Sequence, residues 1–389
     1  MKLEQVLAHA RTHSPSIARA QARVSLGTAQ IQGAEPLLPE NPVVSAALGA
    51  RFNPLGRSFE AQLQIWQPFE IAGERRQRIA AGRAAEHARQ TDVDEMWWMT
   101  EVEIRAAFML ALVARETVEA QASAVEFAER MVAAFELRVQ TGDLAPLDLR
   151  IAETEVADAR QQLLELELEY RNTCVRLAAL AGWPTGAAIE PIGDLPTPVE
   201  IGGQELREMV EEHPSVLSAE ADIDVAAKRL KAAKRDAWPH PALGVYMAHE
   251  QEPGTPFASR VGLLTLTIPM PVWQRNQGQR AEAHAELTVA KADAGALKYE
   301  LGRQLEAQLN AVRFAARRVE TYSQEVLPRF SENLRMLERA FELGEIDLLQ
   351  VLVGQQRFVS QQRRALEIYG EYVEAVRRYE LVAGQAVSP

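Results

Sequence analysis

Cysteine is nearly absent from this chain, and that absence already narrows what the protein can be. The 389 residues contain one cysteine, Cys174, so an internal disulfide and a cysteine-rich metal site are both excluded. No run of about 18 apolar residues occurs, which excludes a transmembrane helix. The net charge of −12 argues against a nucleic-acid partner. The first residues, MKLEQVLAHA, lack the apolar stretch of a signal peptide.

Signals of catalysis are missing as well. Neither of the glycine-rich phosphate-binding patterns, G-x-G-x-x-G and G-x-x-x-x-G-K-[ST], occurs, and none of the seven histidines lies in an H-E-x-x-H pattern. We therefore expect scattered surface or packing histidines, no cofactor, no assigned metal ligand and no enzymatic activity. His249 beside Glu250, near a strand end, is the one pair we consider for a transient metal contact.

Helix-forming residues are abundant instead. Ala, Glu, Gln, Arg and Leu dominate and aromatic residues make up only 6%, which favours long helices. Residues 72–141 and 276–343 predict two helices of about 70 residues, roughly 100 Å each at the α-helical rise. Each long helix is preceded by a shorter helix and followed by a returning helix. The two flanking helices together are about as long as the long helix, so we expect them to pair along it. The first returning helix carries a heptad seam typical of coiled-coil packing. The seam is Leu149, Ala152, Val156, Ala159, Leu163, Leu166, Tyr170, Thr173, Leu177 and Leu180.

The two halves of the sequence resemble each other. HSPSIARAQARV (residues 13–24) is similar to EHPSVLSAEADI (residues 212–223), and landmark residues recur at nearly constant offsets. The landmark pairs are Pro15 and Pro214 at 199, Pro68 and Pro269 at 201, and Gly142 and Gly344 at 202. We interpret this as a tandem duplication. The first repeat is 1–198, ending in the Pro/Gly-rich linker 182–198, and the second is 199–389.

Each repeat predicts the same order of elements: a helix ended by prolines, a β-hairpin, the long helix, a glycine turn and the returning helix. The first helices are predicted at 3–35 and 203–237. The hairpins are predicted at about 43–67, with strands 43–52 and 58–67, and at about 242–268, with strands 242–250 and 259–268.

The predicted strands alternate between apolar and polar residues. In the last strand Leu264, Leu266 and Ile268 alternate with Thr265 and Thr267. Segments of about ten residues with this alternation are typical of transmembrane β-barrels, and single-chain barrels begin at about eight strands. Four strands are therefore too few, so a membrane-spanning sheet would have to be completed by other subunits. The alternative, two soluble hairpins packed on the helices, fits the periodicity equally well.

Three stretches carry a resemblance to a known family. They are LLPENPVVSAALG (residues 37–49), QPFEIAGERRQRIAAG (residues 67–82) and IPMPVWQRNQGQRAEA (residues 268–283). Together with the duplicated order of elements, they resemble the TolC-like outer-membrane efflux proteins over essentially the whole chain, and most closely the outer-membrane component of cobalt–zinc–cadmium efflux systems. The resemblance implies a mainly α fold with β, internally duplicated. It combines a long, coiled-coil-like α-helical barrel with a transmembrane β-barrel shared by three protomers, four strands per chain.

The resemblance also implies a function and partners. The chain would be the passive outer-membrane channel of a tripartite efflux pump of the RND type, with heavy-metal cations as its cargo. It would lie in the outer membrane of a Gram-negative bacterium and extend into the periplasm. Its partners would be two further copies of itself, outer-membrane lipid, a periplasmic membrane-fusion adaptor and, indirectly, an inner-membrane RND transporter. One alternative is a duct for drug efflux or type I protein secretion. Another, of a different class, is a soluble coiled-coil scaffold.

The family's pattern assigns roles to individual residues. The adaptor-binding turns would be Gly142, Asp143, Leu144, Gly344, Glu345 and Ile346, although an ordinary helix–helix turn also explains the glycines. The strand-to-helix junctions would be Pro68, Pro269 and Pro271. Some members close the tunnel with aspartates where this chain has Gln350 and Val353, which puts an acidic gate there in doubt. The candidate gate or lumen residues are Asp148, Asp347 and Gln350. Trp66, Trp238 and Trp273, near strand ends, fit either an interfacial belt or packing at the corner.

Overall fold

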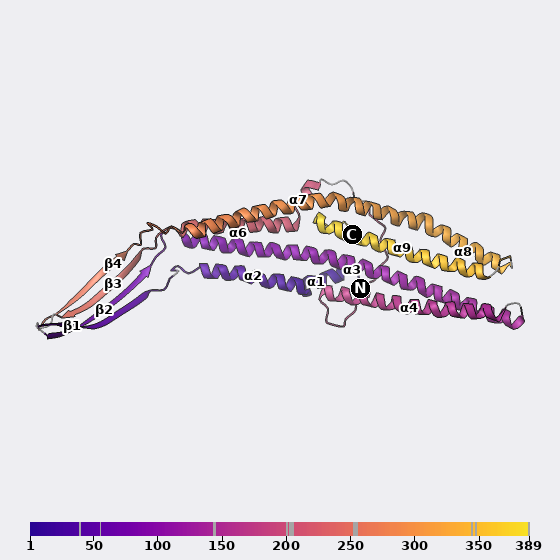
Figure 1. The fold of residues 1–389 in the computed structure, drawn as a ribbon, viewed down its shortest axis with the longest axis horizontal. Coiled ribbons are helices and arrows are strands. Elements are labelled where there is room, and N and C mark those ends of the chain that lie inside the picture. Colours follow the sequence, from indigo (N-terminus) through magenta and orange to yellow (C-terminus); the bar gives the residue numbers. More distant parts are fainter. Residues whose placement is uncertain are drawn as a thin grey trace. The chain divides into compact units, whose positions relative to one another are not determined.

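Over the residues that it describes, the computed structural model is mainly helical with one β-sheet (Figure 1). It describes residues 1–38, 40–54, 56–142, 145–199, 201, 206–251, 256–343, 345–346 and 348–387. The chain forms two compact units, and each unit combines segments of both sequence repeats. The first unit is Met1–Ala20, Val93–Val216 and Leu297–Pro389, and the second is Gln21–Asp92 and Leu217–Ala296. The boundary at residue 198 concerns the sequence repeat and stays a prediction.

The helices follow the predicted order in both repeats. The first repeat contains α1 (Leu3–His13), α2 (Pro15–Ala34), α3 (Glu74–Thr141) and α4 (Pro146–Ala181). The second contains α5 (Leu206–Glu211), α6 (Pro214–Arg235), α7 (Gln277–Thr321), a π-helical turn (Tyr322–Val326), α8 (Leu327–Glu342) and α9 (Leu348–Ala383). The long helices begin and end within a few residues of the predicted positions, and a returning helix follows each of them, as expected.

Prolines explain the departures from that prediction. Each first helix is broken before a proline, at Ser14 and at His213, because the residue before proline is disfavoured in the helical conformation. Ser14 is indeed extended, with φ −62° and ψ 128°. The second long helix widens into its π turn just before Pro328, and there the Leu327 N–H donates to the Tyr322 carbonyl. Proline has no N–H of its own, and such local irregularities are a common response to it.

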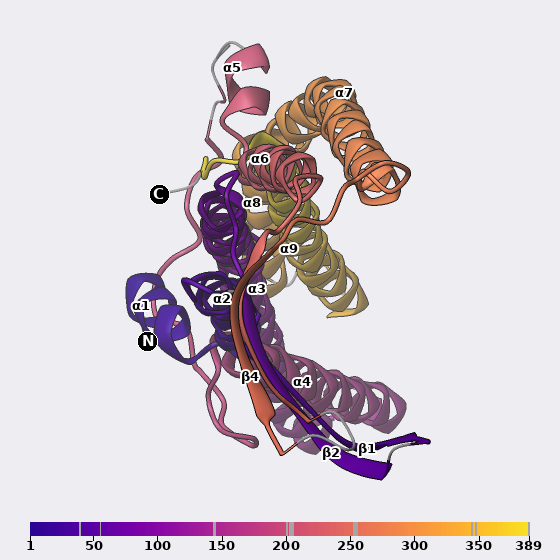
Figure 2. The ribbon, with the colours of Figure 1, turned by 90° about the vertical axis from the view of Figure 1, so that its left-hand side faces the viewer.

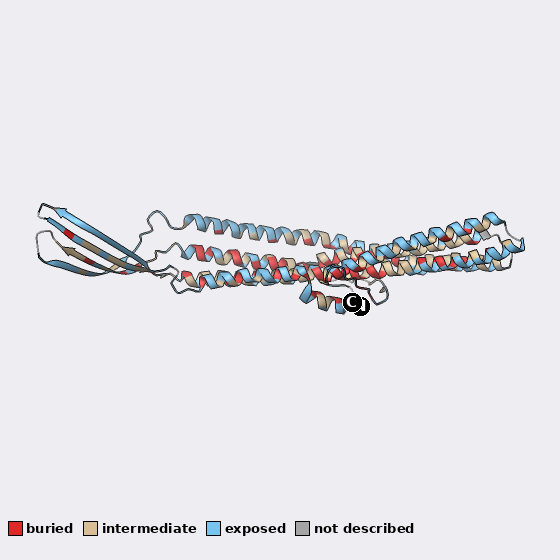
Figure 3. Ribbon diagram, turned by 90° about the horizontal axis from the view of Figure 1, so that it is seen from below, coloured by how far each residue is buried: buried red, intermediate tan, exposed pale blue. Residues whose placement is uncertain are grey.

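The core of the first unit lies where helices pair. Every position of the predicted α4 seam is buried or half-buried, which confirms the heptad packing. Ile104, Phe108 and Leu112 of α3 pack with Leu177 of α4 and Val6 of α1. A second cluster joins α7 and α9 around Leu305, Val312, Tyr372 and Tyr379. Figure 3 shows buried positions recurring along the helices between exposed ones, as expected for amphipathic helices.

The break in each first helix packs against the end of a returning helix. In the first repeat, Ser14 Oγ donates to the Leu180 carbonyl at 3.2 Å. In the second, His213 Nε2 donates to the Leu381 carbonyl at 2.9 Å. Gly182 and Gly384 follow these carbonyls with φ of +85° and +70°. A Cβ at Gly182 would lie 2.1 Å from the His13 carbonyl oxygen, so only glycine fits this approach.

Candidate functional site: the sheet, its junctions and the helix turns

The second unit contains one antiparallel sheet in the order β1-β2-β3-β4. Its strands are β1 (Val43–Asn53), β2 (Gly56–Pro68), β3 (Ala242–Gln251) and β4 (Ala258–Thr267), close to the predicted hairpins. β2 pairs with β3, so the two hairpins, one from each repeat, form one continuous layer. Figure 2 shows this layer as a single curved sheet. Within the described chain, β1 and β4 each have one neighbouring strand, which leaves two open edges.

One face of the sheet is apolar. The register aligns Val44, Ile65, Val245 and Leu264 in one row across all four strands. The apolar members of this face are Val44, Ala46, Leu48, Ala50, Phe52, Phe59, Ala61, Leu63, Ile65, Leu243, Val245, Met247, Leu264 and Leu266. Among the described residues, the strands make extensive contacts only with one another, so no helix covers this face. Leu264 is accordingly 82% exposed.

The opposite face carries most of the uncharged polar side chains. Ser45, Gln62, Gln64, Tyr246 and Thr265 lie on it, together with Trp66, Leu263 and an ion pair in which Arg51 Nε is 2.5 Å from Glu60 Oε1. The register therefore confirms that Leu264 and Leu266 point to one side and Thr265 to the other. The two-faced pattern is that of a sheet between lipid and a wet interior.

The apolar face is bounded by polar residues. His249 and Arg260 pair across β3 and β4 on that face, and Arg57 lies beyond Phe59 on β2. All three are toward the hairpin turns, whereas Gln67 follows Ile65 on the side of the helices. The apolar rows thus form a band that ends on both sides before the strands do.

The predicted junction prolines lie where strands give way to helices. Pro68 is the last residue of β2 and pairs with Ala242, and the next residue, Phe69, donates its N–H to the Pro241 carbonyl at 2.9 Å. Pro269 and Pro271 follow the end of β4. Proline ends a ladder because it cannot donate to it.

Hydrogen bonds then set the start of α3. Glu70 accepts the Arg75 N–H at 3.0 Å and pairs with the Arg78 side chain. Burial raises the pKa of nearby Asp236, which Arg78 opposes. Trp238 and Trp273 are 54% and 85% exposed at these junctions, as an interfacial location requires.

The two helix–helix turns lie in the first unit and are described in part. Gly142 ends α3 with φ +80°, the left-handed conformation that favours glycine, and open space surrounds it. Asp143, Leu144, Gly344 and Asp347 lie outside the described residues. Glu345 is exposed and donates its N–H to the Ala340 carbonyl at 2.9 Å, while Ile346 is half-buried. Of the two glycines only Gly142 is described, and its left-handed backbone agrees with the predicted glycine turn at the end of α3.

The remaining gate candidates lie near these turns. Asp148 stands in the first turn of α4 and is half-buried. Gln350 is exposed, and with Val353 it lines a groove between α8 and α9. Nothing in their surroundings brings the two together, and their role in a gate stays a prediction.

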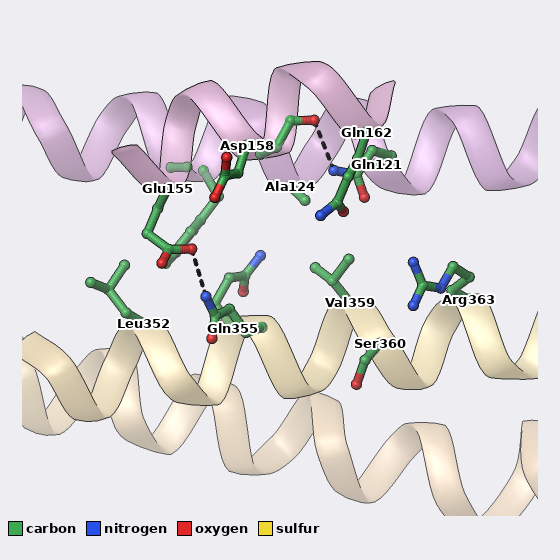
Figure 4. A pocket seen from close by; sticks show the side chains of 14 residues that line it. Gln121, Ala124, Glu155, Asp158, Gln162, Leu352, Gln355, Val359, Ser360 and Arg363 are labelled. Atoms are coloured by element: carbon green, nitrogen blue, oxygen red, sulfur yellow. Dashed lines mark hydrogen bonds between the residues drawn. The ribbon is translucent and has the colours of Figure 1, made fainter. Parts of the chain in front are cut away.

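A groove lined by both polar and apolar side chains, missed from the sequence, lies between the hairpin α3–α4 and α9 (Figure 4). Its cavity volume is about 260 Å³. Gln121 Nε2 donates to the Ala159 carbonyl at 3.0 Å, and Gln356 Nε2 donates to Glu155 Oε2 at 2.6 Å across the groove. Asp158, Gln162, Ser360 and Arg363 add further polar groups. These residues come from three helices, so no spacing within a single helix gives a signal for the groove.

Two features are not found among the described residues. No helix there is long and apolar enough to cross a membrane. No group of three or more His, Cys, Asp or Glu side chains in that part of the chain is arranged to hold a metal ion.

Comparisons with known proteins agree with this architecture. The outer membrane efflux protein family (OEP) matches residues 6–183 and 206–385. The cobalt-zinc-cadmium resistance protein CzcC of Cupriavidus metallidurans is 25% identical over 330 residues, 85% of this chain and 78% of CzcC. The pyoverdine export outer membrane protein OpmQ of Pseudomonas putida is 25% identical over 419 residues, 100% of this chain and 87% of OpmQ.

A solved structure shares the fold. A crystal structure of CusC superposes with a TM-score of 0.75 at 15% identity and covers 98% of this chain and 92% of that one. The fold is thus that of the TolC-like channels, and members of the matched efflux family are passive channels, not enzymes. The family match spans nearly all of both repeats, so the chain belongs to the outer membrane efflux protein family and is an efflux channel component of the Gram-negative outer membrane.

Proposed function

We propose that the chain forms, as a homotrimer, the outer-membrane exit duct of a tripartite efflux pump for heavy-metal cations. The observation that carries the proposal is the four-stranded sheet, with one apolar and uncovered face and two open edges. In lipid an open edge leaves backbone N–H and C=O groups without partners, so the sheet has to be closed. Three copies joined edge to edge, β1 to β4, supply enough strands for a barrel, whereas one copy falls below the minimum of about eight.

The apolar band then faces lipid and the polar face lines the interior. Trp238 and Trp273, exposed beside the strand ends, suit the membrane interface. The helices of the three copies would continue the duct into the periplasm. A duct of this kind does no chemistry, and the energy for export would come from an inner-membrane RND transporter.

A periplasmic adaptor would join the channel at its helix turns. Gly142 and Glu345 are exposed in the single chain, which leaves both open to a partner. We include Asp143, Leu144, Gly344 and Ile346 in this contact on the strength of the family pattern. The groove between α4 and α9 offers amide and carboxylate partners on the same helices.

The choice of cargo rests on the relatives. CzcC is by name a cobalt-zinc-cadmium resistance protein, and it supports heavy-metal cations. OpmQ is by name a pyoverdine export protein, so export of small organic molecules is the second candidate.

Complementation separates these two cargoes. Cells that lack the native protein receive the chain together with its own adaptor and transporter, and growth is measured in zinc, cobalt and cadmium and, separately, with siderophores or drugs. Restored metal tolerance supports the proposal, and restored siderophore or drug export alone contradicts the metal cargo. Cross-linking in detergent tests the trimer: a folded chain that stays monomeric in detergent-free buffer would overturn the shared barrel.

A further inference from the structure

Basic residues end the apolar face of the sheet on the side of the hairpin turns. His249 of β3 and Arg260 of β4 are partners in the register, and Arg57 of β2 lies beyond Phe59 on the same face. Both arginines are exposed in the single chain, and His249 is half-buried. The guanidinium carbon of Arg57 lies 5.3 Å from the centroid of the Phe52 ring. Neither arginine forms an ion pair within the described part of the chain.

The carboxylates at this end of the sheet lie on the other face. Neighbouring side chains in a strand point to opposite sides, so Glu60 and Glu250 are turned away from the basic residues. Arg51 accompanies Glu60 there as an ion pair. His249 and Glu250 therefore point apart, which argues against the transient metal contact that their adjacency suggests. Among the described residues, the outward face at this end carries positive charge without a carboxylate to balance it.

The end of the apolar band runs obliquely across the strands. The last apolar residues of β1 to β4 on this face are, in order, Phe52, Phe59, Met247 and Leu264. In the register each of them lies one or two rows closer to the helices than the one before. Strands of a membrane barrel are tilted by about 35–45°, so a plane parallel to the membrane crosses neighbouring strands at shifted rows. The slant agrees with such a tilt, and it puts the three basic residues at one edge of the membrane.

Closure of the sheet would turn this edge into a ring. In the trimeric barrel proposed above, β4 of one copy adjoins β1 of the next. Arg57 is on β2 and Arg260 on β4, so an arginine would recur on every second strand, two in each copy and six in three copies. Neighbouring strands are about 4.8 Å apart, which separates successive arginines by about 10 Å.

We propose that this ring of Arg57 and Arg260, with His249 between them, binds the phosphate groups of the lipids that surround the barrel. The proposal rests on the trimeric barrel of the proposed function. A bilayer presents its polar headgroups directly outside the hydrocarbon core, which is where the end of the apolar band places these residues. A guanidinium offers parallel N–H donors to phosphate oxygens, and basic clusters beside a membrane span are typical of anionic lipid binding. Because the helices extend into the periplasm, the leaflet concerned is the outer one.

A lipid fits this edge better than a free anion does. Phe52 and Phe59, the apolar residues next to the arginines, are 66% and 54% exposed. An acyl chain would cover these rings while the phosphate of the same molecule meets the guanidinium groups. Inorganic phosphate would leave the rings bare, so apolar contact and charge together point to one amphipathic ligand.

The test is lipid binding to the purified trimer in a non-ionic detergent, measured by native mass spectrometry. The probes are lipid A, a diphosphorylated glycolipid, and phosphatidylcholine, whose phosphate is balanced by its choline. The sheet variant is Arg57→Gln with Arg260→Gln. The matched control is Arg329→Gln with Arg335→Gln, which removes two exposed arginines from α8 and so changes the charge equally. The two single sheet variants are measured as well, so that the test stands even if the double variant does not assemble.

Wild type and the α8 control should bind lipid A equally, and the sheet variant should bind it at least about tenfold more weakly. Phosphatidylcholine should bind weakly and alike to all of them. Arg57→Lys with Arg260→Lys keeps the charge but loses the planar fork, so its affinity for lipid A should lie between those of wild type and the glutamine variant.

Equal binding of lipid A to wild type and the sheet variant would overturn the proposal, and so would an equal loss in the α8 control. Displacement of lipid A by inorganic phosphate at the same phosphate concentration would show that a free anion is the ligand, and would overturn it too. The same spectra report the mass of the assembly. A chain that is not trimeric contradicts the proposed barrel, whereas a trimer that does not bind lipid A contradicts the ring alone.

Discussion

Gly182 offers the sharpest test of the contact between the end of α4 and the break between α1 and α2. We compare Gly182→Ala with Gly186→Ala, because both glycines have a left-handed backbone, with φ of +85° and +88°. Either alanine suffers the left-handed penalty of about 1–2 kcal/mol. Around Gly186 nothing lies within 4 Å of the new Cβ. At Gly182 the same atom would lie 2.1 Å from the His13 oxygen and 2.5 Å from its carbonyl carbon, so backbone must move.

Such overpacking adds about 1–3 kcal/mol, which makes Gly182→Ala roughly twice as damaging as Gly186→Ala. For a unit of this size each kcal/mol lowers the unfolding midpoint by roughly 2–4 °C. The assay is thermal unfolding of the detergent-solubilised protein, followed by circular dichroism at matched heating rates. Equal midpoints for the two variants would refute the reasoning, since they would mean that the contact between Gly182 and His13 is absent or yields freely.

Three further predictions test the sheet, a buried histidine and a turn. Leu266→Arg places charge on the lipid face, which costs about 2–4 kcal/mol at the bilayer midplane, so it should lower the amount of outer-membrane trimer on gels far more than Thr265→Arg; equal losses would mean that the faces are misassigned. Burial lowers the pKa of His213 below 6.5, so as the pH drops the unfolded chain takes up the proton before the folded chain does. The contribution of His213 to the free energy of unfolding is therefore full above pH 6.5 and should decrease as the pH falls. The thermal unfolding midpoint, measured from pH 8 to pH 5, should decrease accordingly, and less so in His213→Gln. Gly142→Val with Gly344→Val should leave the trimer level normal but abolish adaptor pull-down and metal tolerance, and full tolerance would show that the turns are not the docking end.

The helices and strands and their order could be predicted from the sequence because the signals for them are local. Alternation marks the strands, a heptad marks α4, and glycines and prolines mark the turns. The structure adds the register between strands, which the alternation within single strands does not give. It places Leu264 and Ile65, from different repeats, on the same face of the sheet.

What the sequence did not predict depends on contacts between distant segments. The breaks of the first helices are the exception, because Pro15 and Pro214 are local signals: the residue before proline is disfavoured in the helical conformation, so each first helix could have been divided there from the sequence. The groove of Figure 4 needs three helices in place. The stacking of His9 on Trp183 likewise joins residues that lie far apart in the sequence.

The pairing of β2 with β3 has a consequence for how the protein reaches its folded state. Pro68 and Ala242 are partners although the whole first helical hairpin lies between them in the sequence. The edge of β2 therefore stays unpaired, and the apolar residues of the first β-hairpin stay exposed, until the second half of the chain has been synthesised and β3 can pair with β2. Pairings so distant form slowly, and an exposed strand edge invites pairing with other chains. The first half made alone should be the aggregation-prone species, and a chaperone that holds β2 during transit would protect the step on which assembly waits.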